Sequence, residues 1–239
     1  RAVHHTASTA AVCGGGAALR PGEVSLAHRG VLFLDELAEF RRDLLEALRQ
    51  PLEDATITVS RATGSVTYPS RVLLVGAANP CPCGFWGDVI QPCRCAPQER
   101  ERYRRRLSGP ILDRIDLHVA VPRLSPEELV GLGDRRGESS AQVRARVIRA
   151  REIQRRRWEP FGYRCNAEIP ERLLRRETPL GPTEAAFLRD AARRMALSGR
   201  GLSRLLRVAR TIADLDGDGA PLGVSHLAEA LGYRPGALW

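Results

Sequence analysis

The sequence predicts an α/β core with a parallel sheet, followed by a small all-α domain. Val31 to Leu34 and Arg71 to Ala78 are continuous apolar runs, which are typical of parallel strands covered on both faces. Helical patterns alternate with these strand patterns, and that order is characteristic of an α/β sheet. Four short helical segments then occupy residues 167–239.

The composition is that of an ordinary globular protein. A chain of 239 residues with 43% hydrophobic content can bury a substantial core. No apolar run approaches the length of a membrane span, and the N-terminal residues lack the apolar core of a signal peptide. We therefore expect a cytoplasmic protein with no membrane partner.

The chain is strongly basic, and all of its basic residues are arginine. The formal net charge of +9 favours an anionic partner such as nucleic acid or nucleotide phosphates. A bias towards GC-rich codons would also raise the arginine count, so the charge alone does not define a binding surface. Because lysine is missing, the phosphate-binding motif G-x-x-x-x-G-K-[S/T] cannot occur here. We therefore expect either the C-terminal part of a longer ATPase or a fold that has lost its nucleotide, and the start at Arg1 favours the former.

The elements expected before the second strand follow from local signals. Residues 1–30 are rich in small residues and glycine and predict loops and short strands. A helix is expected over Phe40–Gln50, ending before Pro51. Two β-branched runs, Ala55–Ser60 and Val66–Tyr68, surround a glycine-containing turn and predict a hairpin.

The second half is expected to become helical. An arginine-rich helix is predicted over Pro97–Leu107 and a further strand over Ile111–Val121. A long helix is expected over Ser139–Arg157, after a glycine-rich break. The final helices are expected at residues 170–176, 183–195, 201–215 and 224–231. This organisation predicts an α/β core over 1–124, a connecting arginine-rich segment over 125–166 and a helical domain over 167–239.

Paired acids follow the first apolar strand directly. P-loop ATPases place such a pair at the end of the Walker B strand. In that arrangement Asp35 would hold Mg²⁺ through water, and Glu36 would polarise the water that attacks the γ-phosphate. The alternative is that Asp35 only caps a helix beginning near Leu37.

Four of the six cysteines form two C-x-C pairs, Cys81 with Cys83 and Cys93 with Cys95. Four thiols joined by a short glycine-containing loop favour a tetrahedral Zn²⁺ site in a reducing compartment. C-x-C is less usual than C-x₂-C, so buried free thiols and redox chemistry remain alternatives. Cys13 and Cys165 have no such pattern.

Several long segments, taken in order, resemble the magnesium-chelatase-like ComM/YifB family of AAA+ ATPases. The segments are RPGEVSLAHRGVLFLDEL from Arg20, ANPCPCG from Ala78, SGPILDRIDLHV from Ser108 and VARTIADL from Val208. The resemblance covers nearly the whole chain. It implies a partial AAA+ core of the P-loop type followed by a helical lid, in a hexameric ring that uses ATP and Mg²⁺ and binds DNA, with branch migration as the best-known activity.

The resemblance also assigns roles to residues. Besides Asp35 and Glu36, Asn79 would be the sensor that bonds the attacking water or the γ-phosphate, although it could simply open the turn before Pro80. Arg114 would be the arginine finger for a neighbouring subunit. A surface ion pair with a neighbouring acid is the alternative for Arg114.

Two further assignments concern the lid and the hairpin. Arg200 would contact the nucleotide from the lid, with Arg204 and Arg207 as competing choices. Arg61 and Thr63 at the hairpin tip would contact the DNA backbone, or the hairpin is a plain surface feature. His4 and His5 form a family-like His-His-Thr segment with a weak claim to a metal.

Two other functions remain open. One is a chelatase-like motor that remodels a protein partner. The other is a non-hydrolysing fragment that binds DNA or a neighbouring subunit, which the absence of lysine favours for the isolated chain.

Overall fold

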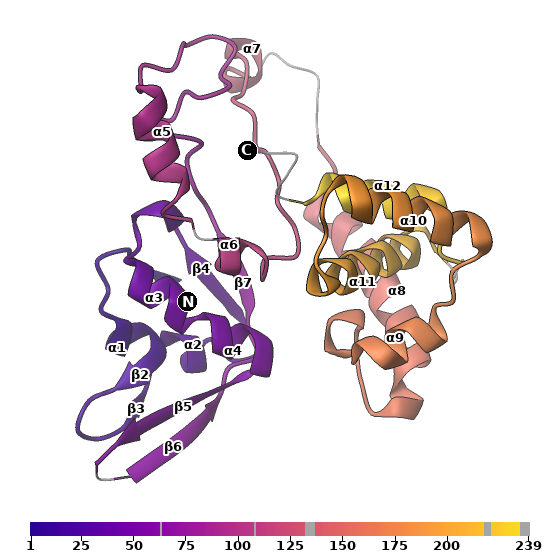
Figure 1. The fold of residues 1–239 in the computed structure, drawn as a ribbon, viewed down its shortest axis with the longest axis horizontal. Helices are drawn as coiled ribbons and strands as arrows, with labels where there is room; N and C mark the ends of the chain where they lie inside the picture. Colours follow the sequence, from indigo (N-terminus) through magenta and orange to yellow (C-terminus); the bar gives the residue numbers. More distant parts are fainter. Residues whose placement is uncertain (63, 108, 132–136, 218–220, 235–239) are drawn as a thin grey trace. The chain divides into compact units, whose positions relative to one another are not determined.

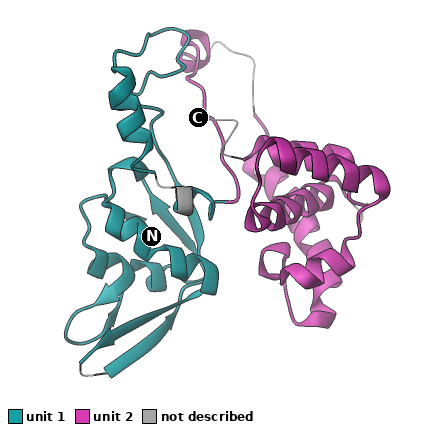
Figure 2. Ribbon diagram, viewed as in Figure 1, with its two compact units in different colours: residues 1–115 teal, residues 116–239 magenta. Residues whose placement is uncertain are grey.

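In the computed structural model the chain forms two compact units, Arg1–Ile115 and Asp116–Trp239 (Figure 1, Figure 2). The structure describes residues 1–62, 64–107, 109–131, 137–217 and 221–234. Each unit has its own hydrophobic core, so each has the packing of a separate domain.

A three-stranded parallel sheet forms the centre of the first unit. Its strands are β1 (Ala2–Val3), β4 (Val31–Leu34) and β7 (Leu73–Gly76), with β4 in the middle. Val3 lies beside Leu34, and β4 pairs with β7 along its whole length. The carboxyl ends of the three strands therefore meet at one edge of the sheet. Mixed strands and helices, with a parallel sheet in one unit and helices in the other, confirm the predicted α/β class.

Only one face of this sheet is covered by described residues. Leu32 and Leu34 of β4 are fully buried, whereas Val31 is 44% exposed. On β7, Leu73 and Val75 are 62% and 40% exposed and share the open face with Val31. The expectation that both faces are covered is therefore wrong within the described residues of the first unit, because these three side chains remain exposed.

Short helices cover the buried face and supply most of the first core. They are α1 (Thr9–Cys13), α2 (Glu23–Leu26), η1 (Leu37–Glu39), α3 (Arg42–Ala47) and α4 (Arg49–Asp54). The predicted end before Pro51 is wrong, since α4 contains this residue in its first turn. A proline is tolerated there because the N–H groups of a first turn have no partner within the helix.

Two hairpins lie next to each other in the first unit. The predicted hairpin is confirmed as β5 (Thr56–Arg61) with β6 (Gly64–Pro69), and a smaller one pairs β2 (Gly14–Gly15) with β3 (Arg20–Pro21). The Tyr68 hydroxyl donates a 2.6 Å hydrogen bond to the Leu19 carbonyl oxygen. This bond joins the base of the large hairpin to the loop of the small one.

The chain after β7 contains helices but no further strand in its described part. The predicted arginine-rich helix is α5 (Pro97–Arg104), followed by α6 (Gly109–Leu112). The strand expected over Ile111–Val121 is wrong, since residues 117–121 are extended but have no strand partner among the described residues. An apolar segment becomes a strand only when a neighbour completes its hydrogen bonds.

The second unit is helical. It contains α7 (Pro126–Leu129), α8 (Ser140–Trp158), α9 (Glu171–Glu177), α10 (Pro182–Arg194), α11 (Gly199–Asp216) and α12 (Val224–Gly232), with short 3₁₀ turns η2 (Glu159–Phe161) and η3 (Asn166–Glu168). The long helix and the four final helices confirm the sequence prediction. Ser139 caps α8 by accepting the amide hydrogen of Gln142, as its residue type predicts.

The core of the second unit contains a buried polar network. The Asp214 carboxylate accepts hydrogen bonds from Arg157 at 2.6 and 3.0 Å, from Arg210 at 3.1 Å and from Asn166 at 2.8 Å. Asn166 also accepts a 2.7 Å bond from the indole of Trp158, which is completely buried. The network ties α8, α11 and η3 together around a paired, fully buried charge.

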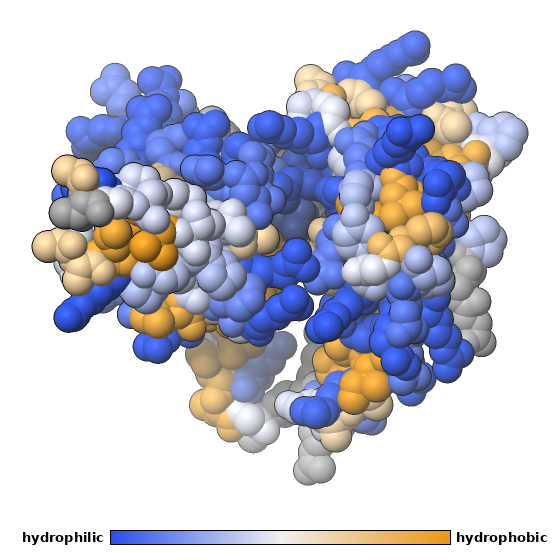
Figure 3. All heavy atoms as spheres, turned by 90° about the horizontal axis from the view of Figure 1, so that it is seen from below, coloured by the Kyte–Doolittle hydropathy of each residue, from blue (hydrophilic) through white to orange (hydrophobic). Residues whose placement is uncertain are grey.

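The surface is mostly hydrophilic. Blue groups dominate the face drawn in Figure 3, with separate apolar areas between them. Large apolar side chains that remain exposed include those of Leu73, Val89 and Val121. None of the described helices combines the length and the apolar character needed to cross a membrane.

Candidate functional site

The predicted acids and the predicted sensor lie at the same edge of the sheet. Asp35 and Glu36 follow β4, and Asn79 lies three residues beyond β7. The Leu37 amide donates to the Ala77 carbonyl at 2.7 Å, and the Ala77 amide donates to Leu34 at 3.0 Å. These two bonds continue the β4–β7 pairing and bring the two segments together.

The backbone at the acid pair has an unusual conformation. Glu36 is left-handed, with φ 53°, and its amide donates to Asp35 Oδ1 at 2.9 Å. The 3₁₀ turn that starts at Leu37 has no side-chain cap, so the alternative role of Asp35 as a helix cap does not describe this arrangement. Both carboxylates are exposed, and oxygen ligands of this kind are those that Mg²⁺ prefers.

His5, which the sequence offered only as a weak metal candidate, lies beside the acid pair. Its Nδ1 lies 2.9 Å from Glu36 Oε2, and its ring meets Phe40 edge-on. The parallel pairing of Val3 with Leu34 explains the contact, because the same register continued by two residues sets position 5 beside position 36. The His-His-Thr segment was the available signal, but the sequence alone gave no partner for it.

Asn79 is exposed and joined to α5 through its backbone. Its amide hydrogen bonds to the hydroxyl of Tyr103, which is itself buried. Burial is the main cause that raises the pKa of Tyr103, and the bond from Asn79 opposes this rise. The segment carrying the predicted sensor is thus attached to the helix that follows the cysteine loop.

The guanidinium of Arg114 is buried within the first unit. Only 8% of this side chain is exposed, and its NH2 lies 2.9 Å from Glu53 Oε1 at the end of α4. Glu53, which is distant in the sequence, is therefore a partner of Arg114. The sequence reasoning missed Glu53 because an ion pair between residues so far apart in the chain leaves no local pattern.

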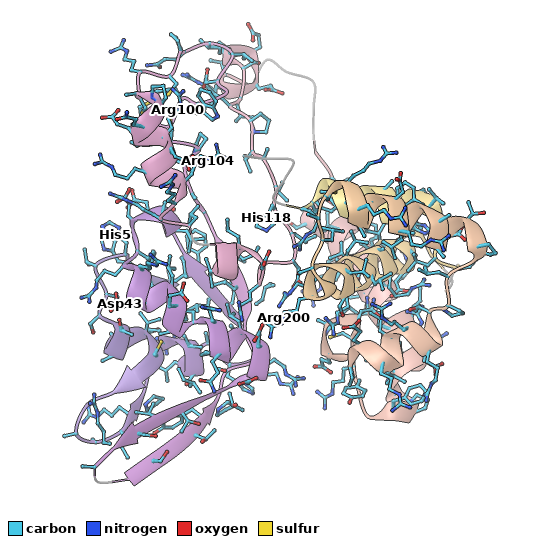
Figure 4. All side chains as sticks on the ribbon, in the orientation of Figure 1. His5, Asp43, Arg100, Arg104, His118 and Arg200 are labelled. Carbon is cyan, nitrogen blue, oxygen red and sulfur yellow. The ribbon has the colours of Figure 1, made fainter. Side chains whose placement is uncertain are left out.

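The three candidate arginines of the lid differ in their surroundings. Arg200 is exposed in the first turn of α11 (Figure 4). Arg204 is 2.7 Å from Asp116, and Arg207 donates to the Ile169 carbonyl at 2.8 Å. Burial lowers the pKa of Arg207. Arg200 is thus the most accessible of the three.

The large hairpin presents a polar face. Hydroxyl pairs cross it at 2.9 Å between Thr58 and Thr67 and at 3.0 Å between Ser60 and Ser65. Arg61 is exposed at the end of β5, whereas Thr63 lies outside the described residues. The hydroxyls lie on one face of the hairpin and Arg61 belongs to the other face, and groups of both kinds can donate to phosphate oxygens without reading bases.

The four predicted cysteines come together. The Sγ atoms of Cys81 and Cys83 are 3.4 Å apart, and each lies 3.6 Å from Cys93. Cys95 completes the group, with all four sulfur atoms within 4.8 Å of one another.

Backbone amides surround the sulfur atom of Cys83. Hydrogen bonds from the amides of Phe85 and Arg94 lower the pKa of this thiol to about 6. A thiolate stabilised in this way is a ligand for a soft or borderline metal ion.

Comparison with known proteins identifies two family models along the chain. Magnesium chelatase, subunit ChlI, matches residues 1–129, and the C-terminal model of the same subunit matches residues 137–234.

Individual relatives agree with these matches. The chain is 48% identical over 234 residues to competence protein ComM of Haemophilus influenzae, covering 98% of this chain and 44% of that protein. It is 45% identical to YifB of Escherichia coli over 98% of this chain and 45% of that protein. It is 30% identical to the magnesium-chelatase 38 kDa subunit of Acidiphilium rubrum, over 87% of this chain and 52% of that subunit. The chain therefore spans about half of the length of each of these relatives.

Proposed function

Because the chain belongs to the magnesium chelatase ChlI family and matches its ComM and YifB members, we propose that it forms part of a ring-shaped ATPase that acts on DNA. The observation that carries the proposal is the meeting of Asp35, Glu36 and Asn79 at one edge of the parallel sheet. Ligands of open α/β sheets bind outside the carboxyl ends of the strands. In this proposal ATP and Mg²⁺ bind at that edge.

Each residue at this edge has a separate role in the proposed hydrolysis of ATP. Asp35 would hold Mg²⁺, and the bound ion would neutralise phosphate charge. Glu36 accepts the proton of the attacking water, and Asn79 orients that water by a hydrogen bond. The chain has no lysine, so the groups that cradle the phosphates in this proposal come from another part of the longer protein.

Two arginines extend the proposal to the assembly. Arg114 neutralises transition-state charge at the site of a neighbouring subunit, which requires that its guanidinium leave Glu53 when a ring forms. Arg200 contacts the nucleotide from the helical unit, and its exposure favours it over Arg204 and Arg207. A hexamer is the assembly we propose.

DNA is the proposed substrate. The net charge of +9, the exposed Arg61 and the hydroxyl rows of the hairpin support contacts with a phosphate backbone. Contacts of this kind tolerate any sequence, which suits an enzyme that moves along DNA or migrates a branch.

The test is ATP turnover by the full-length protein, with and without single-stranded and branched DNA. Glu36→Gln should lower turnover by about 10²–10⁴-fold while ATP still binds, because the general base is lost. Glu39→Gln is the control, since Glu39 lies in the same segment but pairs with Arg106. Undiminished turnover in Glu36→Gln would remove Glu36 from this role.

A chelatase-like motor acting on a protein partner is the second candidate function. The family models and the similarity to a magnesium-chelatase subunit favour it. Turnover that responds to a protein partner and not to DNA would support this candidate against the first.

A further inference from the structure

We propose that Cys81, Cys83, Cys93 and Cys95 bind one Zn²⁺ ion through their four sulfur atoms, and that the ion holds the loop over residues 80–96 on the start of α5. The thiols lose their protons to solvent as the four Zn–S bonds form. This ion is distinct from the magnesium of the proposed ATPase site and does not depend on that activity.

The spacing of the sulfur atoms carries the proposal. Tetrahedral zinc with Zn–S bonds of about 2.3 Å sets its sulfur atoms about 3.8 Å apart. The separations between Cys81, Cys83 and Cys93 are 3.4, 3.6 and 3.6 Å, and Cys95 lies within 4.8 Å of all three. The four atoms are therefore close enough together for one tetrahedral zinc ion to bind them all.

The same distances argue against the alternatives. A disulfide joins two sulfur atoms at about 2.05 Å. The sulfur atom of Cys93 lies 3.6 Å from those of both Cys81 and Cys83, so it is not bonded to either of them. An iron–sulfur cluster separates its thiolates by the width of the cluster, whereas here all four lie together. Unrelated buried thiols would have no reason to converge from two C-x-C pairs.

The loop backbone is arranged to bring the two pairs together. The Gly84 amide donates to the Cys81 carbonyl at 3.0 Å, and Gly84 is left-handed, with φ 82°, so the first pair lies in a tight turn. Asp88 Oδ1 accepts hydrogen bonds from the backbone amides of Ile90 and Gln91 at 2.7 and 2.8 Å. These bonds form a second turn, after which the chain leads to the second pair of cysteines. Both turns are formed by hydrogen bonds within the loop and so do not depend on the metal. They bring the cysteine side chains into position to bind it.

Arginine provides charge compensation and a connection to α5. A zinc ion with four thiolates carries a net charge of −2, which nearby cations stabilise. Arg100 of α5 donates to the Cys95 carbonyl at 2.7 Å and lies 4.1 Å from the ring centroid of Trp86 (Figure 4). The bound ion would therefore fix both Trp86 and Asn79, which flank the first pair, relative to this helix.

The experiment measures metal content by mass spectrometry in full-length protein purified with reductant and without added metal. We expect about one zinc per chain, and its loss in Cys83→Ser and in Cys93→Ser. Cys165→Ser is the matched control, because Cys165 is also a partly buried free thiol but belongs to the helical unit and not to the group of four. This variant should keep its zinc.

A second measurement keeps the proposal testable if the variants do not fold. Wild-type protein in which Co²⁺ replaces zinc should show the intense visible absorption of tetrahedral cobalt thiolates, and chelation should make residues 80–96 sensitive to protease. Zinc-free protein with unchanged protease resistance would overturn the proposal. So would bound iron in place of zinc, or equal loss of zinc in Cys165→Ser and Cys83→Ser.

Discussion

The carboxylate of Glu36 is contacted by a residue from the turn that follows a different strand, β1. His5 Nδ1 lies 2.9 Å from the Glu36 carboxylate, and the left-handed backbone of Glu36 turns that carboxylate away from the strand direction. A side chain held at one end by a strained backbone and at the other by its contact with His5 loses little entropy when it orients a water molecule.

We therefore predict that His5→Ala lowers kcat of the full-length ATPase more than it changes KM. About tenfold in kcat, or ~1.4 kcal/mol in the barrier, is expected for misplacing the base without removing it. The control is His4→Ala, because the Nδ1 of His4 lies 2.9 Å from the hydroxyl oxygen of Thr6 rather than near Glu36. Equal effects of the two variants would show that the segment matters only for folding.

A second prediction at this scale concerns Asp214, whose carboxylate is completely buried with Arg157 and Arg210. Asp214→Asn should destabilise the helical unit by about 3–5 kcal/mol, because it leaves the buried guanidinium of Arg210 and the partly buried one of Arg157 without their counter-charge. Urea unfolding followed by circular dichroism measures the loss. Asp216→Asn is the control, since Asp216 is exposed beside His226, and a similar loss in both would contradict the argument.

Among the elements, the β5–β6 hairpin is the one whose sequence and structure agree most fully. Alternating β-branched residues define its strands, and local turn chemistry defines its register. Because it is attached through Tyr68 and Leu19 to the small hairpin, its tip has a fixed base from which to contact a ligand.

Arg61→Ala should weaken DNA binding by the full-length protein without regard to DNA sequence. Loss of one phosphate contact should reduce the slope of log affinity against log salt by about 0.7–0.9. Fluorescence anisotropy across a salt series measures this slope. Arg194→Ala removes the same charge from α10, where the arginine pairs with Asp190, and should leave the slope unchanged. An unaltered slope in Arg61→Ala would remove the hairpin tip from the DNA contact.

At the scale of the whole molecule, the most unusual feature is the exposed apolar face of the parallel sheet. Val31, Leu73 and Val75 present apolar surface on strands whose sequence is suited to full burial. The relatives are about twice as long as this chain, and in our proposal the remainder of a longer protein covers this face.

Val75→Asp should therefore lower the melting temperature of the full-length protein sharply, because an unpaired charge would be buried, at a cost of about 3 kcal/mol or more. Val66→Asp is the matched control, since Val66 is similarly exposed but lies on the hairpin. Calorimetry compares the two. Equal small shifts would show that the face stays open in the full-length protein.

Sequence information was sufficient where structure depends on local signals and insufficient where it depends on distant partners. The hairpin, the long helix capped by Ser139 and the convergence of two C-x-C pairs follow from turn residues, periodicity and spacing. The failure at Ile111–Val121 has the opposite cause, because pairing and not apolar character makes a strand. The contacts of Arg114 with Glu53 and of His5 with Glu36 arise only from the tertiary register.

The two described tryptophans lie one in each unit and in opposite surroundings. Trp158 is sealed in the helical core with its indole bonded to Asn166, and Trp86 is half exposed beneath Arg100 in the cysteine loop. With Trp239 replaced by phenylalanine, the intrinsic fluorescence of this chain would separate into a blue-shifted and a red-shifted emitter. Each unit would thus carry its own optical reporter, so that loosening of the cysteine loop and melting of the helices could be followed in one sample without any added dye.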